Sequence, residues 1–253
     1  MRFTPVSFIA GTQADRIKFI TDGLVAYYDV NSYNSSLSTW LDLTTNGNNA
    51  TVEGSALTLT ANKGWKFNGT NNHLTMPTFS GSTALTVMIW GDVNNNYTTR
   101  SAQVTETLFS KRIGTNNGFN STHIFRISAT ADAITTSGQS GTDTTNQGFR
   151  GALTGSINFI GFQSNESTSS LLYLGYGNAV SSSWIDGTGV GWADGGGLTT
   201  GSILFPYTQQ LIFGSSSSGM YTGTVGIIAV YNRLLTNDEM NTNYLAVSAS
   251  AVY

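Results

Sequence analysis

The residues best suited to chemistry in this sequence are two tryptophans and two aspartates within one glycine-rich segment. They are Trp184, Asp186, Trp192 and Asp194, and a glycine directly follows each aspartate. An exposed indole ring stacks on the face of a sugar, and a nearby carboxylate accepts sugar hydroxyls or holds a hard cation. We therefore take these four as the candidate ligand-binding residues. The alternative is a loop whose tryptophans cover one end of the fold and whose Asp-Gly pairs form turns.

A metal ion is the first cofactor to consider at this segment. Calcium prefers oxygen ligands, which the two aspartates offer, but the regular Asp-x-Asn-x-Asn-Gly spacing of a calcium loop is absent. Zinc needs three or four ligands, whereas the chain has only His73 and His123 and no cysteine. We therefore expect no metal site and no cofactor, with calcium as an alternative that the spacing does not support.

Catalytic carboxylates are the next group to consider. Cleavage of a glycosidic bond requires two carboxylates roughly 5 to 10 Å apart. No glutamate lies two residues from another acidic residue, the spacing that would direct both to one face of a strand. Nucleophile-elbow and phosphate-loop motifs are also absent. We therefore expect no catalytic residue and no enzymatic activity. The glutamates are Glu53, Glu106, Glu166 and Glu239.

The composition describes the kind of protein that must position these residues. Charged residues are 10 % of the 253, against about 25 % in ordinary globular chains, and the net charge is −3. A surface that follows phosphates needs clustered Lys and Arg, so we expect no nucleic-acid partner. No apolar run approaches the roughly 18 residues of a membrane span, so we expect no membrane partner. The 39 % hydrophobic content and 29 glycines favour one β-rich domain.

Short apolar runs between clusters of Gly, Asn, Ser and Thr predict strands along most of the chain. The clearest runs span residues 24–30, 56–60, 85–90, 124–129, 157–162, 171–174, 210–213 and 224–231. The runs 85–90 and 224–231 carry apolar residues on both of their faces, which is typical of strands in the middle of a two-layer sandwich.

One helix is expected near the C-terminus. Thr236 stands three residues before Glu239, a spacing that predicts a reciprocal capping box at the start of a helix. Met240, Tyr244 and Leu245 would then form a short apolar face.

Residues 1–21 precede the first clear strand and are expected to form an N-terminal arm, and residues 22–253 one domain. The arm lacks a convincing signal-peptide cleavage site, so we do not expect export by that route. Each large apolar side chain left in water would cost about 1.5 to 3 kcal/mol, so the arm should contact a neighbouring molecule. Packing along its own sheet is the alternative. The apolar residues are Phe3, Val6, Phe8, Ile17 and Phe19.

Several segments resemble, in order, the laminin-G-like, concanavalin A-like jelly-roll family. Residues 40–51 are similar to its W-x-D-x-S-G-N-G-N-x-G-T turn, and residues 67–72 to its F-D-G-x-N-D-Y element. Residues 223–239 resemble its closing strand, with Y-N-R-x-L, and the short helix that follows. Weaker likenesses occur at residues 23–29, 85–90 and 108–111.

The resemblance implies an all-β, antiparallel two-sheet jelly-roll sandwich with one short C-terminal helix. Domains of this kind occur in bacteriophage particles and in surface adhesins, and a phage protein needs no export signal. We therefore expect a virion structural protein (capsid decoration, fibre or tail component) with a glycan-adhesion role. It would form a homo-oligomer or symmetric array and contact other virion proteins through the arm. The alternatives are an extracellular or cell-surface carbohydrate-binding module or adhesin and, third, a sugar-active enzyme.

Overall fold

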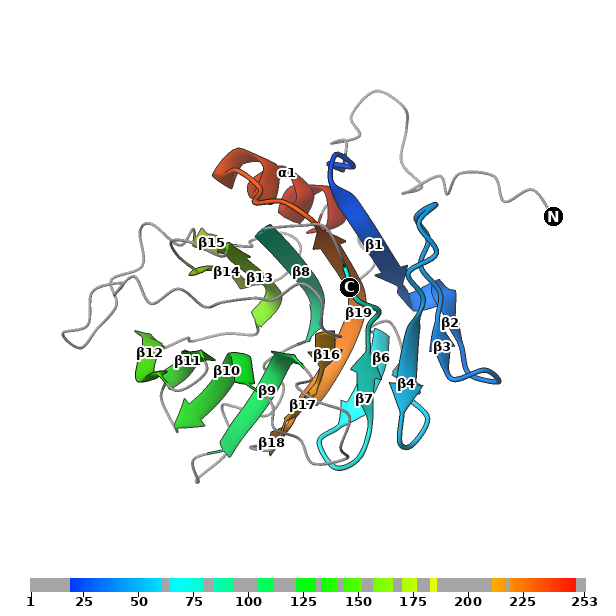
Figure 1. Cartoon of the computed structure of the whole chain (residues 1–253), viewed down its shortest axis with the longest axis horizontal. Coiled ribbons are helices and arrows are strands. Elements are labelled where there is room, and N and C mark those ends of the chain that lie inside the picture. Colours follow the sequence, from blue (N-terminus) through cyan, green and yellow to red (C-terminus); the bar gives the residue numbers. More distant parts are fainter. Residues whose placement is uncertain are drawn as a thin grey trace.

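The computed structural model of this chain describes residues 19–60, 64–79, 84–92, 104–111, 122–130, 133–140, 143–151, 157–165, 170–176, 183–185, 211–216 and 219–248. Most of these residues lie in strands of two large antiparallel sheets, which Figure 1 shows as two layers. One α-helix in the described residues, α1 (Asn237–Ser248), follows the last strand. The predicted all-β sandwich with a short C-terminal helix is confirmed.

We call the two large sheets sheet A and sheet B. Sheet A has the order β15 (Ser183–Ile185), β14 (Ser170–Tyr176), β13 (Ile157–Asn165), β8 (Ala84–Asp92), β19 (Thr222–Tyr231), β6 (Gly64–Asn68) and β5 (Thr58–Thr60), and β1 (Leu24–Asp29) also pairs with β19. Sheet B has the order β12 (Asp143–Gly151), β11 (Ala133–Ser140), β10 (Thr122–Thr130), β9 (Val104–Lys111), β16 (Leu211–Phe213), β7 (His73–Thr75), β4 (Ala50–Glu53), β3 (Thr39–Trp40) and β2 (Tyr33–Asn34). The remaining elements are the 3-10 turn η1 (Val30–Ser32) and the hairpin of β17 (Ser215–Ser216) and β18 (Gly219–Met220).

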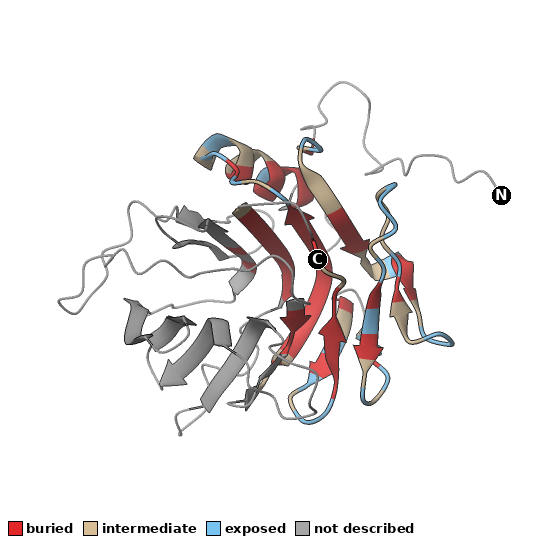
Figure 2. Ribbon diagram, in the orientation of Figure 1, coloured by how far each residue is buried: buried red, intermediate tan, exposed pale blue. Residues whose placement is uncertain are grey.

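The central strand β19 is buried on both faces, as its sequence predicts (Figure 2). Side chains alternate along a strand, so Ile228 and Val230 face sheet B while Ile227, Ala229 and Tyr231 face the opposite way. This second face packs against α1, so the molecule has three layers around β19.

The core between the sheets is rich in aromatic side chains. Phe67 of sheet A and Phe213 of sheet B meet edge to face, with ring centroids 4.9 Å apart, and both are fully buried. Trp40 and Leu74 of sheet B are also fully buried. Their burial excludes water between the layers and stabilises the sandwich.

Helix α1 begins with the predicted capping box. The Glu239 amide donates to Thr236 Oγ1 over 3.2 Å, and the Thr236 amide donates to Glu239 Oε2 over 2.9 Å. Met240 and Tyr244 are buried as expected, but Leu245 is 39 % exposed. Val247 is buried instead, because positions 240, 244 and 247 share one helix face and position 245 does not. No helix among the described residues is long and apolar enough to cross a membrane.

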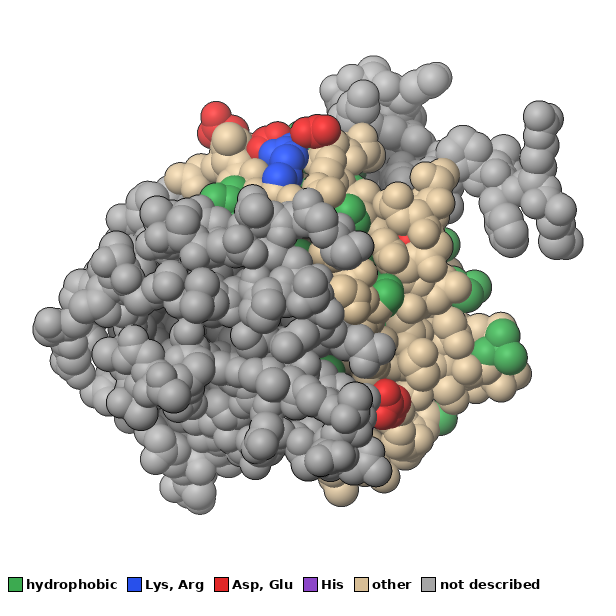
Figure 3. Space-filling view, viewed as in Figure 1, with side chains coloured by type: hydrophobic (Ala, Val, Ile, Leu, Met, Phe, Trp, Pro, Cys, Tyr) green, Lys and Arg blue, Asp and Glu red, His purple; other side chains and the backbone are tan. Residues whose placement is uncertain are grey.

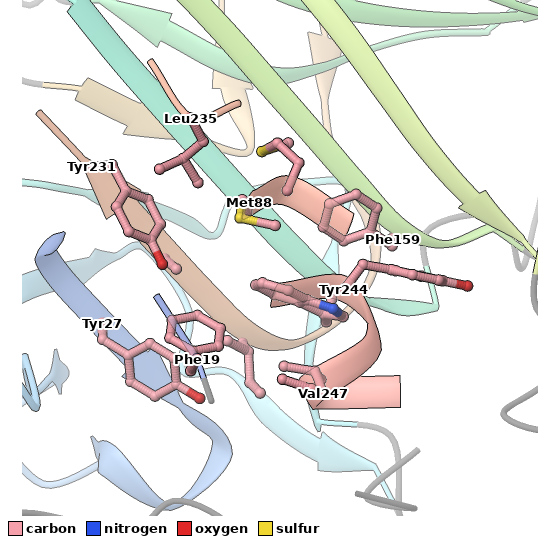
Figure 4. Close-up of a cluster of buried hydrophobic side chains, with 13 residues drawn as sticks. Phe19, Tyr27, Met88, Phe159, Tyr231, Leu235, Tyr244 and Val247 are labelled. Atoms are coloured by element: carbon pink, nitrogen blue, oxygen red, sulfur yellow. The ribbon is translucent and has the colours of Figure 1, made fainter. Parts of the chain in front are cut away.

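The end of the predicted arm belongs to the core of the domain. Phe19 packs edge to face on Tyr27, with ring centroids 5.5 Å apart, and joins the cluster beneath α1 (Figure 4). The Ile20 amide donates to Asn243 Oδ1 over 2.8 Å, and the Tyr231 hydroxyl donates to the Ile20 carbonyl over 2.7 Å. The expected contact of the arm with a neighbouring molecule therefore does not apply at these two positions, which pack within their own domain. Residues 1–18 lie outside the described residues, so their intermolecular contacts stay a prediction.

Candidate functional site

The predicted ligand-binding residues fall mainly outside the part of the chain that the structure describes. Trp184 lies in β15, at one end of the strand order of sheet A, where its register partner is Gly175. Asp186, Trp192 and Asp194 lie outside the described residues. Only one of the four residues is described, so this candidate site stays a prediction.

The carboxylate of Asp42, in the turn within residues 40–51, is fully hydrogen-bonded within the protein. Asp42 Oδ1 accepts the amides of Tyr27 at 3.0 Å and Thr44 at 2.9 Å. Its Oδ2 accepts the Thr44 hydroxyl at 2.7 Å and the Asn48 amide at 2.8 Å. A carboxylate offers about four lone-pair sites, so Asp42 has none left for a ligand. This turn has a structural role: it ties residues 42–48 to β1.

The second family-like turn is also closed on itself. Asn68 Oδ1 accepts the amides of Thr70 at 2.8 Å and Asn71 at 3.1 Å. Its Nδ2 donates to Ser55 Oγ over 2.9 Å and to Asn71 Oδ1 over 2.8 Å. These bonds hold residues 68–72 against the turn that follows β4, and so they fix the neighbouring ends of β4 and β7.

A polar cluster of a different kind lies on these two strands. In the β4–β7 pair, Glu53 is the register partner of His73, while buried Val52 and Leu74 face the core. Since side chains alternate along a strand, Glu53, His73 and Thr75 share the outer face of sheet B. We call these three residues the outer-face cluster.

The cluster holds a half-exposed carboxylate in a fixed position. Thr75 Oγ1 donates to Glu53 Oε1 over 2.7 Å, and His73 Nε2 lies 3.5 Å from Glu53 Oε2. His73 and Thr75 are each 8 % exposed, whereas 44 % of the Glu53 side chain is exposed. The carboxylate therefore accepts one hydrogen bond, from Thr75, on its buried side, and its solvent side can accept O–H or N–H donors.

Figure 3 shows the surroundings of this cluster. One small acidic area lies over the end of β4, and no basic side chain stands beside it among the residues drawn in colour. The mixed acidic and basic group at the top of the view lies over the start of α1 instead. Within the described residues, no three His, Asp or Glu side chains gather as metal ligands.

Sequence reasoning missed this cluster because β4 and β7 are not adjacent in the chain. Glu53 and Thr75 are 22 residues apart, and the intervening strands β5 and β6 belong to sheet A. The available signal was the alternation in residues 50–53 and 73–75, which places apolar and polar residues on opposite faces. That signal identifies two half-buried strands without showing that they pair.

Comparisons with known proteins identify the fold. No protein-family model matches the sequence, and no curated protein matches it. Similar solved structures include a Trypanosoma rangeli sialidase in complex with 2,3-difluorosialic acid, at 15 % identity and a TM-score of 0.57 over 90 % of this chain and 34 % of the sialidase. The binding domain of botulinum neurotoxin DC in complex with SialylT matches at 11 % identity and a TM-score of 0.54, over 90 % of this chain and 52 % of that chain.

A third similar structure is that of botulinum neurotoxin type C, described in connection with cell entry that depends on two ganglioside molecules. It matches at 11 % identity and a TM-score of 0.52, over 90 % of this chain and 51 % of that chain. The chain thus spans about a third of the sialidase and about half of the toxin structures. At sequence identities of 11 to 15 %, the likeness shows a shared fold alone.

The expectation of no enzymatic activity is contradicted by the comparison, because sialidases, which are enzymes, share this fold. Spacing along one strand was a poor basis for that expectation, since strand pairing brings together residues far apart in the sequence, as it does Glu53 and His73. The match covers only 34 % of the sialidase, so the alternative of a binding domain stays open.

Proposed function

We propose that this chain is a carbohydrate-binding domain that recognises glycans in the extracellular space. The observation that carries the proposal is its likeness, over 90 % of its length, to a toxin binding domain in complex with SialylT. The sialidase and the ganglioside-dependent toxin support the same ligand class. This proposal takes up the alternative drawn from the sequence, a carbohydrate-binding module or adhesin.

The chemistry of the chain is compatible with this ligand class. Sugars are recognised through hydroxyl groups, which need precisely placed hydrogen-bond acceptors and donors more than a strong electrostatic field. Only 10 % of the residues are charged, and the outer face of sheet B presents Thr51 and the Glu53 carboxylate to solvent. A rigid sheet holds such groups more accurately than a loop does.

The finer expectation, a capsid decoration, fibre or tail component in a virion, stays a prediction. None of the similar structures named above is a particle protein. The homo-oligomer or symmetric array also stays a prediction, as do the contacts of the arm with other virion proteins. Glycan binding does not depend on them, so it can be tested on the isolated chain.

The test is a glycan array probed with the purified full chain. The array should carry sialylated oligosaccharides beside their desialylated counterparts, and recovered glycans should be analysed for cleavage. We expect saturable binding to a defined subset that an excess of the same soluble glycan abolishes. The absence of binding to every glycan, together with no response to millimolar oligosaccharide in solution, would refute the proposal.

A further inference from the structure

We propose that Asn46 is a site of spontaneous deamidation, and that the carboxylate formed there uncovers the outer edge of β1. Asn46 and Gly47 lie in the turn of residues 42–48, which we call the edge turn. The proposal concerns the lifetime of the fold and does not depend on the proposed glycan binding.

The outer edge of β1 is covered largely by side chains of the edge turn. Among the strands that the structure describes, β1 pairs with β19 alone. On its other side, the Tyr27 amide donates to Asp42 Oδ1 over 3.0 Å. The Val25 carbonyl accepts the side-chain amides of Asn46 at 3.1 Å and Asn48 at 2.8 Å. An unpaired strand edge is a template for pairing with another chain, so the edge turn protects β1.

The side chain of Asn46 takes part in this cover as a donor. Its Nδ2 donates to the carbonyls of Leu24 over 3.3 Å and Val25 over 3.1 Å. It also donates to Thr44 Oγ1 over 3.1 Å. All three bonds depend on the N–H groups of the amide, and a carboxylate has none. The position therefore suits Asn and not Asp.

The glycine that follows Asn46 supplies the reaction. The backbone nitrogen of Gly47 attacks Cγ of Asn46 and forms a Cγ–N bond. The Cγ–Nδ2 bond breaks, and the amide leaves as ammonia with the proton from the Gly47 nitrogen. Water then opens the succinimide ring at either carbonyl, which gives an aspartyl or an isoaspartyl residue. Both residues are exposed, and a Cβ built on Gly47 would have nothing within 4 Å, so the ring has room to form.

The described residues contain one other Asn-Gly pair, Asn68–Gly69, which is held more firmly. Asn68 lies in β6, where its register partner is Thr222, and its Oδ1 accepts the Thr70 amide at 2.8 Å. A Cβ built on Gly69 would lie 1.9 Å from Thr222 Oγ1, so this glycine has little free space. Ring closure at Asn68 requires the strand end to open first, whereas Asn46 lies outside the strands.

Deamidation reverses the interaction of residue 46 with β1. The new carboxylate would face two backbone carbonyls of β1, whose oxygens also carry negative charge. Thr44 cannot donate to it, because its one hydroxyl proton is already donated to Asp42 Oδ2 over 2.7 Å. Residue 46 therefore turns to solvent, and Asn48 is left as the side-chain amide that covers the Val25 carbonyl.

The first experiment follows the reaction by peptide mapping. The purified full chain is kept at mildly alkaline pH, either folded in buffer or unfolded in urea, and samples are digested with trypsin. Residues 46 and 68 fall on separate peptides, 19–63 and 67–100, and mass spectrometry detects the change from amide to carboxylate in each. In the folded chain, residue 46 should react at least about tenfold faster than residue 68, because Asn68 must first leave its strand. In urea the two rates should become similar.

The second experiment tests the consequence with two variants. Asn46→Asp places the product at the site, and Asn49→Asp adds the same charge directly after the edge turn. Asn49 is the matched control because its Oδ1 accepts the Asp42 amide at 2.9 Å, which a carboxylate can also do. Asn46→Asp should lower the Tm by about 3 °C or more and speed hydrogen exchange of the Tyr27 amide. Asn49→Asp should lower the Tm by about 1 °C or less and leave that exchange unchanged.

Two kinds of result would overturn the proposal. Equal rates at residues 46 and 68 in the folded chain would do so, as would a residue 46 that reacts in urea but not in the folded protein. Equal Tm values and equal Tyr27 exchange in the two variants would show that Asn46 does not cover the edge of β1.

Discussion

Truncation of Phe19 should destabilise the whole domain, although this residue precedes the first strand. Its ring is 9 % exposed and lies 5.5 Å from the ring of Tyr27, 6.0 Å from that of Trp90 and 6.5 Å from that of Tyr231. Replacement of a buried Phe by Ala costs about 3 to 5 kcal/mol. The lower end applies here because Phe19 lies outside the regular strands, where the backbone can relax around the cavity.

The expected loss for Phe19→Ala is therefore about 3 kcal/mol of unfolding free energy, measured by urea denaturation followed through tryptophan fluorescence. For a chain of this size it corresponds to a fall in Tm of roughly 6 to 12 °C. Leu59→Ala is the matched control: Leu59 is 55 % exposed in β5, and its truncation should cost less than about 0.5 kcal/mol.

Deletions locate the boundary of the domain independently. Compared with removal of residues 1–18, removal of residues 1–20 should lower the unfolding free energy further, by at least the loss expected for Phe19→Ala. The second deletion also removes the bonds from Ile20 to Asn243 and Tyr231. A Phe19→Ala variant as stable as the Leu59→Ala control would refute the assignment of residues 19 and 20 to the core.

Two further predictions concern the start of α1 and the turn after β4. Arg233 binds Glu239 and lowers the pKa of Glu239 from its ordinary value to about 2. The stabilisation is therefore complete above the ordinary pKa of a glutamate and is lost as the pH falls toward 2. Glu239→Gln should therefore cost about 1 to 2 kcal/mol at neutral pH in thermal melts, with the difference vanishing near pH 2, and a pH-independent difference would contradict this. Gly54→Ala should cost more than about 2 kcal/mol, because φ is +83° and the added Cβ would lie 1.7 Å from the Asn71 carbonyl oxygen. Gly47→Ala, with φ of +70° and nothing within 4 Å, should cost about 1 kcal/mol, and equal costs in urea denaturation would contradict the contact argument.

Features that depend on neighbouring residues could be predicted from the sequence. The capping box of Thr236 and Glu239 is one, since both partners lie within one helical turn. The two-sided burial of β19 is another, because it follows from apolar residues at successive positions. Such patterns define each element and its faces without reference to the rest of the chain.

Features that depend on which elements meet could not be predicted. Phe19 is buried because it packs against α1, which lies more than 200 residues later in the chain, and against β1 and β19. Glu53 and His73 became a pair only through the register of β4 and β7. In each case the partner is distant in sequence, and no local pattern encodes it.

The most direct test of the proposed glycan binding is an NMR titration of the isotope-labelled full chain. Sialylated oligosaccharides and their desialylated counterparts are added in turn while the backbone amide signals of both sheets and of α1 are followed. We predict saturable, dose-dependent shifts of a defined set of amides in the sheets for at least one glycan, with the signals of buried Met240 and Tyr244 in α1 unchanged. Absence of any saturable shift for the glycans tested, or shifts confined to α1, would contradict the account.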